Sequence, residues 1–178
     1  MELPTNIQKL APLPDIMLRR IEKEMLKFNI KGHIYDNIYL HVPIDLHSSL
    51  QKRANKDKVQ PTLIFTLSFY PWKPPTVFYN SVNINQIYKC QDIDLLQTEM
   101  DKIAGKSMCL CCESVLCHNN WIPTNTIYTV IDEFRAFTKL KVRAVERVLC
   151  NRIQEGLFEK TGHCNSLLLC DYAISDFL

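Results

Sequence analysis

The sequence has little excess charge of either sign and no long apolar run. Among its 178 residues, 21 are Lys or Arg and 19 are Asp or Glu, which gives a formal net charge of +2. A net charge this small does not indicate a nucleic-acid backbone or an anionic membrane as the partner. No window approaches the ~18 apolar residues of a membrane-spanning helix. We therefore expect no nucleic acid and no membrane among its partners.

The first residues also lack the charged segment and the apolar run that together make a secretory signal. This predicts an intracellular protein, cytoplasmic or nuclear, and structural disulfides are rare in those compartments. The chain nevertheless contains eight cysteines. These thiols point to one of three uses: a catalytic thiol, a metal site, or small apolar side chains in the core.

Length and composition favour one folded domain over residues 1–178. Hydrophobic residues make up 47% of the chain and charged residues 22%, which are ordinary values for a globular protein. No internal repeat or low-complexity tract divides the chain. Helical spacing of apolar residues predicts four helical segments, of which the third is one long helix or two abutting ones: 15–28, 90–103, 126–157 and 167–178. Asp15 is placed to cap the first helix, and Gly105 is placed to end the second.

Strands are predicted between the first two helices. Residues 32–44 are rich in Ile, Tyr and Val and are interrupted by Asp36-Asn37, which predicts a hairpin. Residues 62–69 form a β-prone run that leads into a proline-rich turn, and 76–79 form a short strand after it. The polar segment 80–85 is typical of a loop. The sequence thus predicts an α+β fold with an N-terminal helix, a four-stranded antiparallel meander and C-terminal helices.

Two motifs, and the order in which they follow each other along the chain, resemble those of the ubiquitin-conjugating enzyme family. Tyr-Pro-Trp-Lys-Pro-Pro at 70–75 follows a β-prone strand, where the family commonly carries Tyr-Pro-Phe-Lys-Pro-Pro. Met-Cys-Leu at 108–110 leads to Trp-Ile-Pro at 121–123, which is similar to the family's catalytic segment, where an apolar-Cys-Leu step precedes Trp-Ser-Pro and a helix. The resemblance covers roughly residues 15–137. It leaves 140–178 as a divergent C-terminal helical part.

The resemblance implies a UBC-like or RWD-like fold and an enzyme that carries ubiquitin or a ubiquitin-like protein as a thioester on Cys109. An activating enzyme would supply the ubiquitin, and a lysine or a ligase cysteine would receive it. The chain itself would need no cofactor for this chemistry. The family's His-Pro-Asn motif is absent, so Asn83 is the first candidate to stabilise the oxyanion, with Asn119 and Asn120 as substitutes. A catalytically inactive protein-binding module of the same fold is the alternative.

The same resemblance implies residues that bind partners. Trp72, Trp121 and Pro123 would belong to the surface that meets ubiquitin ligases, although Trp72 could instead be a buried structural tryptophan. Basic residues of the first helix would meet an acidic surface of the activating enzyme: Arg19, Arg20 and Lys23. A solvated helix face is the simpler account of these charges.

The cysteine cluster also allows a zinc site. Cys109 and Cys112 have the spacing of zinc ligands, and Cys117 and His118 are the further candidates, although their adjacency strains simultaneous ligation. If zinc held Cys109, that thiol could not carry a thioester. Cys111 or Cys112 would then inherit the role.

Overall fold

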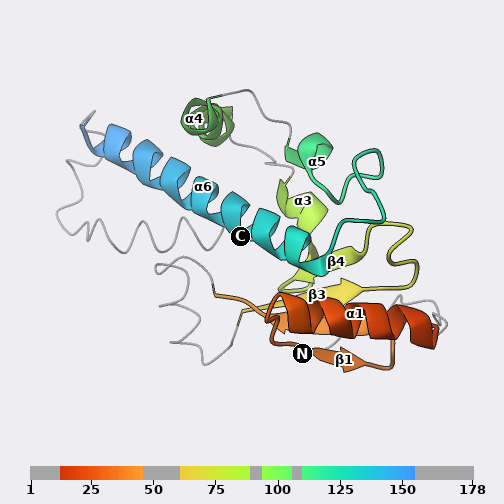
Figure 1. The fold of residues 1–178 in the computed structure, drawn as a ribbon. Coiled ribbons are helices and arrows are strands. Elements are labelled where there is room, and N and C mark those ends of the chain that lie inside the picture. The colour runs from red at the N-terminus through yellow and green to blue at the C-terminus, as the bar shows by residue number, and fades with distance from the viewer. Residues whose placement is uncertain (1–12, 46–60, 89–93, 106–109, 155–178) are drawn as a thin grey trace.

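The computed structural model describes residues 13–45, 61–88, 94–105 and 110–154. The fold is α+β, with an N-terminal helix, an antiparallel sheet and C-terminal helices, as the sequence predicts (Figure 1). In chain order the elements are α1 (Asp15–Lys27), β1 (His33–Tyr35), β2 (Tyr39–Pro43), β3 (Thr62–Thr66), β4 (Thr76–Tyr79), β5 (Val82–Asn83), α3 (Ile84–Tyr88), α4 (Asp94–Ala104), α5 (Leu110–Glu113) and α6 (Ile127–Gln154).

The sheet is a five-stranded antiparallel meander in the order β1-β2-β3-β4-β5, so the prediction of four strands was one short. The additional strand, β5, contains only Val82 and Asn83 and lies in the segment for which a loop was predicted. Asn80 and Ser81 both have positive φ and turn the chain from β4 into β5. A strand of this length is too short to show the alternation of apolar and polar residues by which strands are recognised.

The first hairpin turns at Asp36 and Asn37, as predicted. Their φ values are 52° and 53°, and the Ile38 N–H donates to the Tyr35 carbonyl at 3.0 Å. Positive φ at two successive turn positions suits the twist of the flanking strands, and Asp and Asn tolerate it better than most residues.

Helix α1 begins at Asp15, but Pro14 and not Asp15 occupies the capping position, and no side-chain capping bond is present there. The prediction that Asp15 caps this helix was therefore wrong. The Asp15 charge lies in the first turn, where it complements the helix dipole. Gly105 follows the end of α4 with a φ of 71°, as predicted.

The segment predicted as one long helix or two is a single helix, α6, which is described as far as Gln154. The Thr126 hydroxyl accepts the Thr129 N–H at 3.2 Å and so caps its beginning. Residues 155–178, and with them the last predicted helix, lie outside the described residues. No helix in the described part of the chain combines the length and apolar character needed to cross a membrane.

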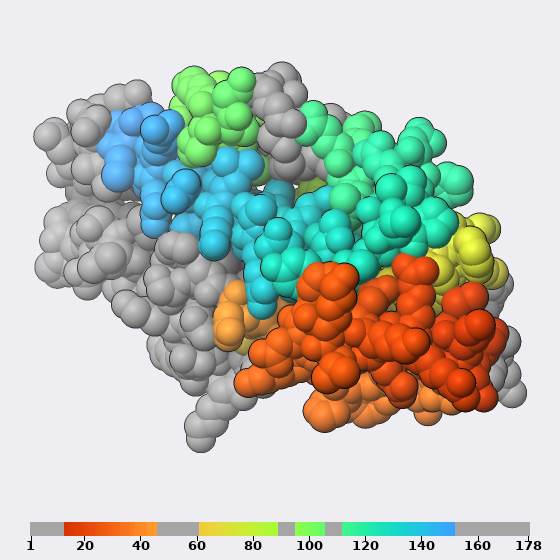
Figure 2. All heavy atoms as spheres, in the orientation of Figure 1, coloured from red at the N-terminus to blue at the C-terminus, as the bar shows by residue number. Residues whose placement is uncertain are grey.

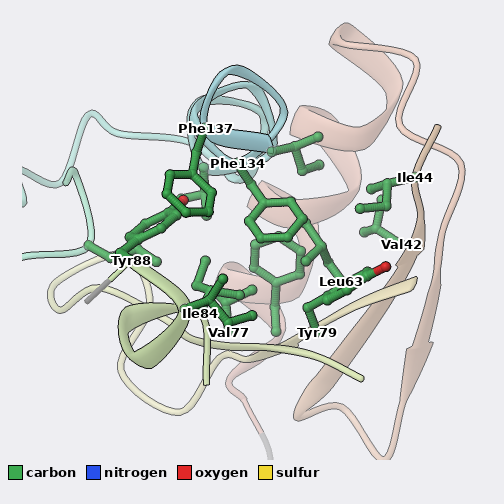
Figure 3. Close-up of a cluster of buried hydrophobic side chains, with 14 of the residues drawn as sticks. Val42, Ile44, Leu63, Val77, Tyr79, Ile84, Tyr88, Phe134 and Phe137 are labelled. Carbon is green, nitrogen blue, oxygen red and sulfur yellow. The ribbon is translucent and has the colours of Figure 1, made fainter. Parts of the chain in front are cut away.

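The main core lies between the inner face of the sheet and α6. Figure 3 shows Phe134 of α6 next to Leu63 of β3 and Tyr79 of β4, whereas Phe137 of α6 lies beside Tyr88. The Phe134 ring lies 5.4 Å from that of Tyr79, and the Phe137 ring lies 4.7 Å from that of Tyr88 in α3, measured between centroids. These aromatic contacts fasten α6 both to the sheet and to α3.

Candidate partner surface and cysteine segment

The two motifs that carry the resemblance lie against each other at one end of the molecule (Figure 1). The Trp121 indole Nε1–H donates to the Pro71 carbonyl at 2.7 Å, across 50 positions of sequence. The Trp121 and Tyr70 rings meet edge to face with centroids 6.0 Å apart. Both side chains are buried. The proline turn and the segment that precedes α6 therefore form one packed unit.

Glu24 of α1 joins both motifs to the first helix. Its buried carboxylate accepts the Tyr70 hydroxyl at 2.6 Å and the Ile127 N–H at 3.1 Å. Arg20 donates its Nε–H to the same carboxylate at 3.0 Å and a second N–H to the Pro123 carbonyl. The Ile127 N–H is in the first turn of α6, where backbone donors have no partner within the helix. One carboxylate thus holds α1, the proline turn and the start of α6 together.

The Tyr70 phenol should make stability fall in alkaline solution. Burial, and then the hydrogen bond to Glu24 and its charge, raise the pKa of Tyr70 far above its ordinary value of 10.0. The stability that the neutral phenol contributes is therefore fully present below about pH 10 and is lost as pH rises toward the folded-state pKa. We expect the free energy of unfolding to fall by up to about 1.4 kcal/mol per pH unit above that point for this one group. Urea unfolding between about pH 8 and pH 11 measures the slope.

Tyr70→Phe should make this alkaline slope shallower by removing the ionisable group. Tyr35→Phe is the matched control, because Tyr35 is 50% exposed, and it should keep the wild-type slope. Identical slopes in wild type and Tyr70→Phe would contradict the assignment. Burial also raises the pKa of Tyr79 and Tyr88, so part of the slope should remain in Tyr70→Phe.

Large apolar side chains next to this bonded pair in the sequence are exposed. Trp72 is 69% exposed, Phe69 63% and Ile122 55%, and they flank the bonded pair Pro71 and Trp121. We call Phe69, Trp72 and Ile122 the junction surface. Large apolar side chains that gather on an exposed surface are typical of protein-binding sites, so these three are the candidates for one. The exposure of Trp72 excludes the alternative of a buried structural tryptophan, while its role in ligase binding stays a prediction.

The other two residues implied for this surface differ in position. Pro123 is exposed. Trp121 is 8% exposed, and its indole N–H is used by the Pro71 carbonyl, so the side chain supports the junction surface from beneath instead of forming part of it. The sequence around a tryptophan in a loop does not show whether its side chain is exposed at a surface or buried under it.

The basic residues of α1 gather around one shallow hollow, which Ile16 and Lys27 also line. Figure 2 shows α1 in red as an outer face of the molecule, next to the start of α6. Arg19 and Lys23 are exposed, whereas Arg20 is half-buried and bonded to Glu24. Arg19 and Lys23 therefore remain the better placed for an acidic partner, which stays a prediction.

The cysteine predicted as nucleophile, Cys109, lies outside the described residues, which resume at Leu110 with α5. Cys112 and His118 are exposed, and Cys117 is half-buried. Within residues 13–45, 61–88, 94–105 and 110–154, no three His, Cys, Asp or Glu residues are grouped in a way that could hold a metal ion. Since the predicted zinc ligands include Cys109, the zinc site stays a prediction.

Two side chains hold the loop between α5 and α6 in place. Glu133 of α6 accepts the Ser114 hydroxyl at 2.6 Å and the Val115 N–H at 2.7 Å. The Asn120 side-chain N–H donates to the Cys112 carbonyl at 2.6 Å and to the Ser114 carbonyl at 3.1 Å. The backbone at Cys112 is thereby tied to the turn that leads into the second motif. The sequence gives no local signal for either of these anchoring roles.

Two of the three candidates for stabilising an oxyanion, Asn83 and Asn120, already have structural partners. The Asn83 Oδ1 accepts the Asn85 N–H at 2.9 Å and caps the start of α3. Asn120 holds the loop just described, and Asn119 is exposed. Although α3 packs against α5, the residue of α3 that shares a cavity with α5 is Tyr88, at the opposite end from Asn83.

Comparisons with protein-family models, curated proteins and solved structures found no match for this chain. The class that the structure defines is an α+β protein with an antiparallel five-stranded meander and a long C-terminal helix. The functional argument rests on the two motifs and on the contacts that join them.

Proposed function

We propose that this chain is a divergent enzyme of the ubiquitin-conjugating type, in which Cys109 carries ubiquitin or a ubiquitin-like protein as a thioester. The observation that supports this most is the bond between the Trp121 indole and the Pro71 carbonyl, because it joins the two motifs that resemble the family. The exposed apolar side chains of the junction surface, which adjoin this bonded pair in sequence, would be available to a ligase.

The chemistry would be an exchange between thioesters. The Cys109 thiolate attacks the carbonyl carbon of the thioester on the activating enzyme, the new C–S bond forms, and the activating enzyme's cysteine leaves as a thiolate. No electrons are gained or lost, so the chain needs no cofactor. Such a thiol must be accessible, and Cys112, which lies in the same segment, is exposed.

A protein-binding module of the same fold, without transfer activity, is the second candidate. It is favoured by the structural use of Asn83 and Asn120, because an amide that caps a helix or fixes a loop is less available to a reacting carbonyl. In that case the junction surface would bind ubiquitin or another protein directly. Zinc bound by the cysteine cluster would suit this candidate, since a metal-bound thiolate does not exchange thioesters.

Incubation of the chain with an activating enzyme, ATP and ubiquitin should give an adduct that a reducing agent removes. Cys109→Ser is expected to lose this adduct completely or to replace it with an ester that resists reduction, because a serine oxygen forms the more durable bond. Cys112→Ser is the matched control and should retain the adduct. Non-reducing electrophoresis with and without a thiol reagent separates these outcomes.

Absence of any adduct with all cysteines intact would contradict the enzyme. If the chain then still binds ubiquitin, and Trp72→Ala weakens that binding, the second candidate is supported. Loss of the adduct in Cys112→Ser but not in Cys109→Ser would move the nucleophile to Cys112.

A further inference from the structure

A cavity of about 190 Å³ lies between α3, α5 and α6, and the proposed function does not use it. Ala136, Phe137 and Leu140 of α6 form its apolar wall. Tyr88 of α3 and Glu133 of α6 provide polar groups, together with residues at the end of α5. An apolar cavity of about 150 Å³ is known to be large enough for benzene. The volume therefore suits an aromatic ring with one small substituent.

The Tyr88 side chain lies beside Phe137 in Figure 3. The residue is 3% exposed, and its buried hydroxyl lies near Glu133 but makes no hydrogen bond of regular geometry within the part of the chain that the structure describes. A buried hydroxyl without a partner is costly, and such groups are rare in native proteins. Burial, and then the charge of Glu133 and a hydrogen-bonding interaction with that carboxylate, raise the pKa of Tyr88, so the phenol is neutral and able to donate at any physiological pH.

Glu133 sets a second requirement for a ligand. Its two carboxylate oxygens accept the Ser114 hydroxyl and the Val115 N–H. A carboxylate offers about four lone-pair positions, so each oxygen can accept one further hydrogen bond. A ligand anion would be repelled by this charge, and an ammonium group would have no acceptor for the Tyr88 hydroxyl. An uncharged group that accepts one hydrogen bond and donates another can bond with both the Tyr88 hydroxyl and the Glu133 carboxylate.

We infer that this cavity binds a small uncharged molecule whose apolar body ends in a carboxamide. The carbonyl oxygen accepts the Tyr88 O–H, an amide N–H donates to Glu133, and the apolar body lies against Phe137 and Leu140. Such a ligand would lie against the end of α5, the helix that contains Cys112. The inference does not depend on thioester chemistry.

Titration of the full chain with benzamide tests this site, followed by 1H–15N NMR spectroscopy. Chemical-shift changes are expected to concentrate at Ala136, Phe137 and Leu140. Tyr88→Phe keeps the ring but removes the donor, and should weaken benzamide binding about fivefold to tenfold, the effect of one neutral hydrogen bond. Toluene has the same ring without the amide, and its affinity should not fall in Tyr88→Phe.

Two further variants serve as controls. Tyr128→Phe alters a more exposed tyrosine, on α6 and outside the lining of the cavity, and should leave benzamide binding unchanged. Leu140→Trp fills the cavity and should abolish binding, while a dispersed NMR spectrum shows that the chain still folds. No shift changes up to the solubility of benzamide, or equal binding by wild type, Tyr88→Phe and Leu140→Trp, would overturn the inference.

Discussion

Replacing Glu24 with alanine is expected to lower the free energy of unfolding by about 3–5 kcal/mol, the usual cost of removing one partner from a buried charged network. The loss is large because the change leaves the buried Tyr70 hydroxyl and the Ile127 N–H without the acceptor they share. The Arg20 guanidinium also loses its carboxylate, although its partial exposure limits this contribution. Equilibrium urea denaturation at neutral pH measures the change.

Glu22→Ala provides the matched control, since Glu22 is an exposed glutamate on the same helix. Its effect should stay within about 0.5 kcal/mol. Glu24→Gln keeps the size and one acceptor oxygen, and should fall between the two. A loss below about 1 kcal/mol in Glu24→Ala, equal to that of an ordinary single hydrogen bond, would show that the carboxylate does not hold the three segments together.

The helices that the sequence predicts well are those in which local pattern and packing agree. In α6, apolar residues repeat along one face, and this face is the one that covers the sheet through Phe134 and Phe137. The first hairpin was predictable for a different reason, because Asp36 and Asn37 tolerate the φ values that its turn requires. By contrast, the two residues of β5 owe their strand conformation to pairing with β4, which no local pattern records.

The candidate site was predictable from the sequence only where the residue types themselves form a recognisable motif. The prolines and aromatics of 70–75 and 121–123 revealed two motifs, but not that Trp121 lies beneath the surface that Trp72 occupies. Glu24 was missed because it bonds residues 46 and 103 positions away, and a glutamate on an amphipathic helix gives no indication of such partners. Contacts this distant in sequence arise from the completed fold.

The two tryptophans of the chain should respond in opposite ways to replacement. Trp121→Ala is expected to cost about 3–5 kcal/mol of stability, because it empties a core position and leaves the Pro71 carbonyl without its donor. Trp72→Ala should change stability by no more than about 0.5 kcal/mol, because the side chain is 69% exposed. Urea denaturation of the two variants gives this comparison directly.

The same pair separates support of the surface from binding at the surface. Trp72→Ala should weaken the binding of a ligase or another partner protein while the fold stays intact, whereas Trp121→Ala should weaken it only in proportion to the loss of folded protein. Trp121→Phe sharpens the distinction, because it keeps a ring next to Tyr70 but removes the indole donor. If Trp72→Ala destabilised the chain as much as Trp121→Ala, Trp72 would be part of the core in solution, and the junction surface would lose its central residue.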